Sequence, residues 1–200
     1  MHSSLEPLIV AAVTLSSLLY TFIWLFPRQW LALCAHPALG GARPTRVMAL
    51  CAHARKALQL GLCAALFFQQ PPSGAPLAAA FRANSLKNIL PGLSLALLGQ
   101  HLNISVYVLL GEAGVYYGSK LGCPTPWVRE WPFSQVRDPQ YTGALLTLAG
   151  CHLLRLTTPL VCVAWGLNYA FLMALESQAL CSPPRKPGPP AAAAKRAKAH

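Results

Sequence analysis

Acidic residues are scarce in this sequence, which has five Asp and Glu against sixteen Lys and Arg in 200 residues. Charged residues make up only 10% of the chain, whereas an average soluble domain has about 25%. A basic nucleic-acid-binding domain reaches a net charge of +11 with many more charges, so that class is largely excluded. A hydrophobic content of 54% also excludes disorder over most of the chain. The composition favours a polytopic membrane protein and predicts no nucleic-acid partner.

Paired cysteines at metal-ligand spacing are missing as well. The seven cysteines include no C-x-x-C pair, and most of them sit inside apolar runs, where cysteine acts as a small hydrophobic residue. We therefore expect neither a disulfide framework nor a zinc site, and no bound metal.

Long uncharged runs are what the sequence has instead. Residues 6–26 carry no charge after Glu6 and are long enough, at about 1.5 Å per residue, to cross a hydrocarbon core of about 30 Å. Residues 88–110 form a further span whose polar residues we expect to face protein or a cavity.

The region between these spans is mixed in character. Residues 57–68 are apolar, but His53, Arg55 and Lys56 precede them. We expect residues 46–56 to form an interfacial segment that leads into a span ending near Phe68.

The last apolar stretch, residues 143–175, is too long for one untilted span and is interrupted at Thr157-Thr158-Pro159. It forms either one span with irregular ends or a helical hairpin. A single span would divide the basic residues evenly, eight against seven, whereas a hairpin places thirteen on one side and three on the other. The positive-inside rule favours the hairpin, with the basic face in the cytosol.

These observations predict an all-α fold for residues 1–182, a single integral membrane domain with three spans followed by a C-terminal helical hairpin. The bundle would contain four to five membrane helices, and a homo-oligomer is compatible with it. Residues 183–200 are basic and rich in Pro and Ala, and we expect this tail to be disordered.

Polar residues concentrate in residues 99–143 and at Glu176, where four of the five acids lie. Gly111, Gly114, Gly118 and Gly122 are spaced by three or four, so on a helix they would form one nearly bare stripe. Such a stripe allows close approach by another helix or by a flat ligand, and the sequence leaves both open.

Four segments resemble the small membrane phospholipid N-methyltransferases, most closely the plant and algal type. They read GQHLNISVYVLLGEAGVYYG, PWVREWPF, VRDPQYTG and ALES, and the resemblance is strong from Leu95 to about Gln178. The VRDPQYTG segment is also similar to a pattern in the wider membrane methyltransferase group, where it precedes a helical hairpin and helps to hold S-adenosylmethionine.

The resemblance implies an enzyme of the endoplasmic reticulum membrane whose active site faces the cytosol. It would transfer methyl groups from S-adenosylmethionine to phosphatidyl-N-methylethanolamine and phosphatidyl-N-dimethylethanolamine, with or without phosphatidylethanolamine as a third acceptor. The product would be phosphatidylcholine, made by direct displacement without a metal.

The resemblance and the chemistry together indicate three sets of site residues. The headgroup ammonium must lose a proton, and the candidate acceptors, among which the sequence does not choose, are His101, Glu112, Asp138 and Tyr141. The cofactor candidates are Gly99, Gln100, His101, Gly111, Gly114, Arg137, Pro139, Tyr141, Glu176 and Ser177. The substrate candidates are Trp127, Arg129 and Tyr117.

The sequence departs from related patterns in three places. The second glycine of a Gly-x-Gly motif is absent at Gly99-Gln100-His101, a second glutamate is absent after Glu176, and Asp138 stands where the wider group has histidine. Two alternatives to a phospholipid N-methyltransferase remain open. One is an enzyme like the isoprenylcysteine carboxyl methyltransferases, and the other is a non-catalytic membrane scaffold.

Overall fold

The computed structural model describes residues 5–39, 41–69 and 86–180, and within these ranges it contains helices and no strands. The elements, in chain order, are α1 (Leu5–Leu25), α2 (Pro27–Cys34), a short 3-10 turn η1 (Pro37–Leu39), α3 (Pro44–Gln69), α5 (Leu86–Val115), α6 (Pro139–Leu153) and α7 (Pro159–Leu180). The predicted all-α class is confirmed.

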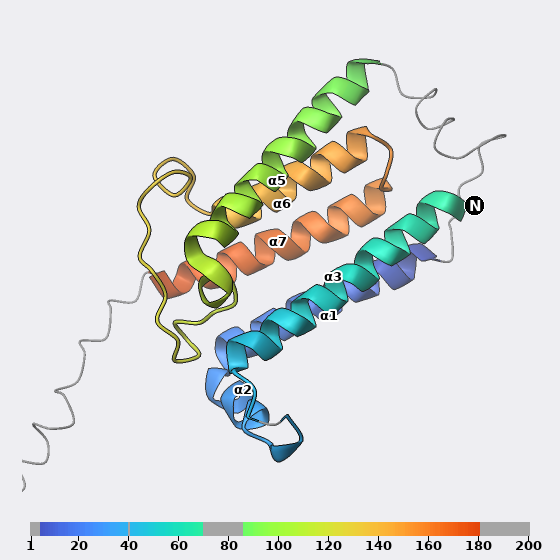
Figure 1. The fold of residues 1–200 in the computed structure, drawn as a ribbon. Coiled ribbons are helices and arrows are strands. Elements are labelled where there is room, and N and C mark those ends of the chain that lie inside the picture. The colour runs from blue at the N-terminus through green and yellow to red at the C-terminus, as the bar shows by residue number, and fades with distance from the viewer. Residues whose placement is uncertain (1–4, 40, 70–85, 181–200) are drawn as a thin grey trace, which may run out of the picture.

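Five long helices form a bundle of two groups (Figure 1). Helices α1 and α3 pack side by side, α5 packs along α6, and α7 contacts both α6 and α1. Three helices, α1, α5 and α7, are long and apolar enough to cross a membrane. Their exposed leucines and valines provide the apolar outer surface that such a bundle needs in lipid.

The C-terminal hairpin is present. Helix α6 ends at Leu153, and the chain turns over residues 154–158 into α7, which begins at Pro159. Fifteen residues give α6 a length of about 22 Å, shorter than a hydrocarbon core of about 30 Å. The hairpin therefore has one short and one long arm.

The predicted change from an interfacial segment at residues 46–56 to a separate span is not seen as a break in the helix. Helix α3 is continuous for 26 residues and packs along α1. The cations at positions 55 and 56 suggested a membrane surface, but they lie near the middle of this helix. Their side chains face an internal cavity, which accounts for charged residues in a long helix.

The prediction of one helical glycine stripe is also wrong. Gly111 departs from helical geometry with φ of 63°, and α5 ends at Val115, so Gly118 and Gly122 lie beyond it in turns. Glycine at a spacing of three or four occurs where a helix ends as well as where helices pack, because glycine adopts the positive φ that helix termini use.

A different pair of glycine contacts joins α5 to α6. A Cβ atom added at Gly99 would lie 2.4 Å from the carbonyl oxygen of Gly143, and one added at Gly150 would lie 2.5 Å from that of Gly92. The backbones of the two antiparallel helices therefore touch at two crossing points. This seam fixes the position of the first turn of α6, where the candidate site begins.

The predicted turn at residues 69–74 lies almost entirely outside the described residues, and the basic tail at 183–200 lies wholly outside them.

Candidate functional site

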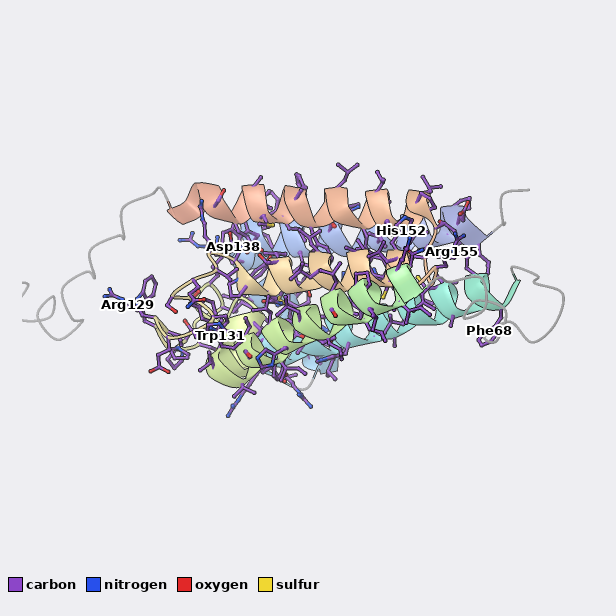
Figure 2. All side chains as sticks on the ribbon, turned by 90° about the horizontal axis from the view of Figure 1, so that it is seen from above. Phe68, Arg129, Trp131, Asp138, His152 and Arg155 are labelled. Atoms are coloured by element: carbon purple, nitrogen blue, oxygen red, sulfur yellow. The ribbon has the colours of Figure 1, made fainter. Side chains whose placement is uncertain are left out.

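A cavity of about 890 Å³ lies between the α1–α3 pair and helices α5, α6 and α7. This volume falls within the range of pockets that enclose a small-molecule ligand. Figure 2 shows the two ends of the bundle: Arg129, Trp131 and Asp138 lie at one end, and Phe68, His152 and Arg155 lie at the other. The cavity extends from Asp138 at the first end to Phe68 at the second.

The centre of the site is Glu176, a partly buried carboxylate on α7. The hydroxyl groups of Tyr117 and Tyr141 both donate hydrogen bonds to its Oε1 atom, each at 2.5 Å. No described residue is seen to donate to Oε2. Two phenols thus orient the carboxylate through one oxygen, and the other oxygen can bind a ligand.

Tyr141 reaches Glu176 because of how α6 begins. Pro139 occupies the first turn of α6, where its missing N–H costs no hydrogen bond and its fixed φ favours the helix. Tyr141 follows in the same turn and lines the cavity with Asp138 and Arg137. Asp138 and Arg137 form a mostly exposed ion pair with an N–O distance of 3.7 Å.

Tyr117 reaches the same oxygen of Glu176 from the turn that ends α5. The backbone N–H of Gly118 donates to the carbonyl of Ala113 at 2.7 Å, the bond that closes a Schellman motif. Tyr117 occupies the left-handed position of this motif, with φ of 56°, where glycine is the usual residue. A bulky side chain in this conformation is strained, which is typical of residues retained for function.

The protonation state of Tyr117 suits its role as a donor. Burial, followed by the nearby Tyr141 and Glu176 charges, raises the pKa of Tyr117 above its ordinary value. Its phenol therefore stays protonated and continues to donate to Glu176 well above neutral pH.

Aromatic rings surround this end of the cavity. The Tyr117 ring lies 5.9 Å from that of Tyr20 and 5.1 Å from that of Trp24, and the Tyr141 ring lies 5.9 Å from that of Tyr169. All five residues line the cavity. Aromatic faces beside a carboxylate favour a positively charged ligand, such as a sulfonium or an alkylammonium.

Lys120 contacts Trp24 near the end of α1. Its Nζ atom lies 3.4 Å from the centroid of the Trp24 ring and donates to the Trp24 carbonyl at 3.2 Å. Burial lowers the pKa of Lys120, although the Glu176 charge acts in the opposite direction. A cation at the carboxyl end of α1 also interacts favourably with the helix dipole.

The structure brings eight of the sequence-predicted site residues to the cavity wall. They are Gln100, Gly114, Tyr117, Arg137, Asp138, Pro139, Tyr141 and Glu176. Gln100 lies where α5 meets α6 and donates a hydrogen bond to Thr147 at 3.0 Å.

The other seven candidates lie away from the cavity wall. They are Gly99, His101, Gly111, Glu112, Trp127, Arg129 and Ser177. Gly99 belongs to the contact between α5 and α6, the ring of His101 lies 5.1 Å from that of Trp131, and Glu112 pairs with Arg46 at 2.5 Å. Trp127 is 82% exposed on the loop before α6.

Several lining residues were not among the predictions. Tyr20 and Trp24 are one turn apart on α1, and that spacing places them on one helical face. His53 lies on α3, with Nε2 at 3.4 Å from the Tyr116 hydroxyl. An apolar span with two aromatic residues on one face resembles ordinary helix packing, so no sequence pattern distinguishes these two residues from packing residues.

No group of three or more His, Cys, Asp and Glu side chains is placed to hold a metal ion within residues 5–39, 41–69 and 86–180.

Comparisons with known proteins agree on one family. The family model described as phospholipid methyltransferase matches residues 88–181. The chain is 36% identical over 160 residues to a protein of Arabidopsis thaliana named phosphatidyl-N-methylethanolamine N-methyltransferase, covering 80% of this chain and 84% of the relative. No solved structure matches the chain.

Proposed function

The chain belongs to the phospholipid methyltransferase family, and we propose that it methylates the headgroup nitrogen of phosphatidyl-N-methylethanolamine and phosphatidyl-N-dimethylethanolamine to give phosphatidylcholine. The observation that supports this most strongly is the Glu176 carboxylate, oriented by Tyr117 and Tyr141 within a large cavity of an apolar helical bundle. The acidic, aromatic end of that cavity suits cationic reactants.

We propose S-adenosylmethionine as the methyl donor. Its sulfonium supplies an electrophilic methyl group when it is bound. The residues present fit such a molecule. The Oε2 atom of Glu176 receives no hydrogen bond from the described residues, so it can accept one from a hydroxyl or amino group. The rings of Tyr20, Trp24 and Tyr117 favour a positive centre. Arg137 and Gln100 add hydrogen-bond donors to the same wall.

The residues of this chain have two tasks in the reaction. They must hold the amine in line with the donor, which lowers the barrier by several kcal/mol or more. They must also accept the proton of the headgroup ammonium. Of the four candidate acceptors, Asp138 and Tyr141 line the cavity, whereas His101 and Glu112 do not. His53, beside Tyr116, is a further candidate that the cavity supplies.

We propose that the end of the bundle bearing Asp138 and Arg129 faces the cytosol in the endoplasmic reticulum membrane. Six basic residues lie in the loops and helix ends near this end of the bundle, which agrees with the positive-inside rule: Arg28, Arg43, Arg46, Lys120, Arg129 and Arg137.

The function is tested with purified full-length protein and a labelled methyl donor in detergent–lipid micelles. The acceptors are phosphatidylethanolamine, its monomethyl and dimethyl forms, and a prenylated cysteine peptide. We expect label in phosphatidylcholine from both methylated lipids. Label on the peptide carboxylate alone would favour the carboxyl methyltransferase alternative, and no product from any acceptor would favour a scaffold.

A further inference from the structure

Two neighbouring cations on α3, Arg55 and Lys56, line the cavity. They follow the helix start at Pro44 by eleven and twelve residues, about 17 Å along the axis. Neither forms a salt bridge with a carboxylate in the part of the chain that the structure describes. Ionisable groups that face the interior of a membrane-protein bundle are costly and mark functional sites.

Their contacts position both groups without neutralising them. Arg55 donates through Nη1 to the carbonyl of Ser16 at 3.0 Å, and its guanidinium lies 5.0 Å from the centroid of the Tyr20 ring. The Nζ atom of Lys56 lies 3.3 Å from the hydroxyl of Tyr169 and 4.8 Å from the centroid of the Trp165 ring. Each contact is to a neutral group, so two positive charges are available to an anion.

The cations are linked to Glu176 through two pairs of aromatic residues. Tyr20, beneath Arg55, contacts Tyr117, and Tyr169, beside Lys56, contacts Tyr141. Since Tyr117 and Tyr141 both bind Glu176, the carboxylate and the cations belong to one continuous wall. At the Asp138 end, Arg137 pairs with Asp138, and Glu176 has no cationic partner at ion-pair distance among the described residues. Arg55 and Lys56 supply positive charge on the α3 side of the cavity.

Beyond the cations, the wall becomes apolar. Lys56, Leu60, Ala64 and Phe68 recur every four residues on α3 and all line the cavity. Leu148 and Leu156 line the cavity as well. The α3 face thus changes from charged to apolar toward the Phe68 end, which Figure 2 places opposite Asp138.

We propose that Arg55 and Lys56 bind the phosphodiester of the glycerophospholipid acceptor. The inference rests on the proposed function. An ethanolamine phospholipid has an amine, then a phosphate, then acyl chains, and the cavity has a carboxylate, then two cations, then an apolar wall in the same order. The amine would lie toward Glu176 and the acyl chains along Leu60 and Phe68. Arginine and lysine are the side chains that bind phosphate most effectively.

The test compares Lys56→Gln and Arg55→Gln with the charge-preserving Lys56→Arg. Arg43→Gln, which removes an exposed charge just before α3, is the matched control. The Michaelis constants for the monomethyl phospholipid and for the methyl donor are measured separately. Loss of a charge-assisted hydrogen bond predicts a KM for the lipid that rises about tenfold or more in both glutamine variants, with the donor KM unchanged. Lys56→Arg should recover the lipid KM, and Arg43→Gln should match the wild type.

A second arm uses only the wild-type protein, so it does not depend on whether a variant folds. The acceptor is a diacyl lipid with the same methylated amine but an uncharged linker in place of the phosphodiester. We expect its kcat/KM to be at least about tenfold lower than that of the phospholipid.

Unchanged lipid KM values in both glutamine variants, or equal use of the two acceptors, would overturn the phosphate site. A rise in the donor KM alone would overturn it too, and would assign the cations to the donor's carboxylate. Failure of the wild-type protein to methylate any ethanolamine phospholipid would instead refute the proposed function.

Discussion

Helix α6 packs closely against α5 but is separated from α3 by the cavity. Against α5, its backbone touches the facing backbone at Gly143 and Gly150, and no Cβ fits at either crossing. Toward α3, it is separated by a cavity of about 890 Å³ lined by polar, cationic and apolar side chains. Glycines close the contact between α5 and α6, whereas large side chains line the space between α6 and α3.

The contrast explains how a small bundle keeps a cavity. Helices without a hydrophobic driving force between them associate through close packing, which small residues allow. The α5–α6 seam fixes the start of α6, and therefore Tyr141, by such packing. The cavity side of α6 can then accept a ligand while the α5–α6 contact holds the helix in place. Substitutions at the α5–α6 contact should therefore affect folding, and substitutions on the cavity side should affect activity.

The close backbone contacts between α5 and α6 at their glycines should be essential for folding. Gly99→Leu would force a side chain into the Gly143 backbone and destabilise the bundle by more than about 3 kcal/mol. The measurement is the melting temperature and monodispersity of the purified protein. The control is Gly61→Leu on α3, since a Cβ there meets nothing within 4 Å. Equal stability of the two variants would contradict the closed seam.

Removing the cavity-lining carboxylate of Glu176 should strongly reduce activity and leave the fold intact. Glu176→Gln retains an oxygen for Tyr117 and Tyr141 but loses the charge that favours cationic reactants. We expect kcat/KM to fall about 100-fold, comparable to the loss of one preorganised electrostatic group. Donor binding measured by calorimetry should weaken in parallel.

The matched control for that variant is Glu130→Gln, which removes an exposed acid from the loop before α6. It should bind the donor as the wild type does. Unchanged donor binding by Glu176→Gln would show that Glu176 has no part in holding the donor.

Two substitutions at Tyr117 should reduce activity in the same way but differ in their effect on stability. Tyr117→Gly removes the strained left-handed tyrosine, so the turn itself should gain about 1 kcal/mol, less the packing that the ring provided. Tyr117→Phe keeps the ring and the strain but loses the hydrogen bond to Glu176. Both variants should lose about tenfold in kcat/KM. Full activity in Tyr117→Phe would show that the hydrogen bond is dispensable.

The ion pair between Arg46 and Glu112 lies outside both the α5–α6 contact and the cavity. Its removal should have the smallest effect on stability and activity. The Arg46 side chain is 59% exposed, and such surface pairs contribute about 1 kcal/mol or less. Glu112→Gln should therefore shift the melting temperature slightly and leave the pH–rate profile unchanged. A shift in the acidic or alkaline limb of the pH–rate profile would instead favour Glu112 as the proton acceptor.

Hydropathy and charge counting predicted much of the fold. The uncharged run of α1 and the hairpin of α6 and α7 followed from span length and from the imbalance of basic residues. The same reasoning did not reveal that α3 is one continuous helix, because Arg55 and Lys56 look interfacial when the cavity that they face is not known.

The site was predicted in part. The VRDPQYTG segment and Glu176 drew attention to residues that the structure brings within hydrogen-bond distance. Tyr20, Trp24 and His53 could not be selected, because membership of a cavity depends on how α1 and α3 are placed against α7. The spacing of the glycines after position 110 also did not reveal that α5 ends at Val115.

The role of Glu176 in phospholipid methylation is tested most directly by labelled methyl transfer to phosphatidyl-N-dimethylethanolamine, measured for the purified wild-type protein and for Glu176→Gln in the same micelles and at equal folded concentration. We expect labelled phosphatidylcholine from the wild type and about 100-fold less from the variant. No labelled phosphatidylcholine from the wild type, or equal rates from the two proteins, would contradict this role.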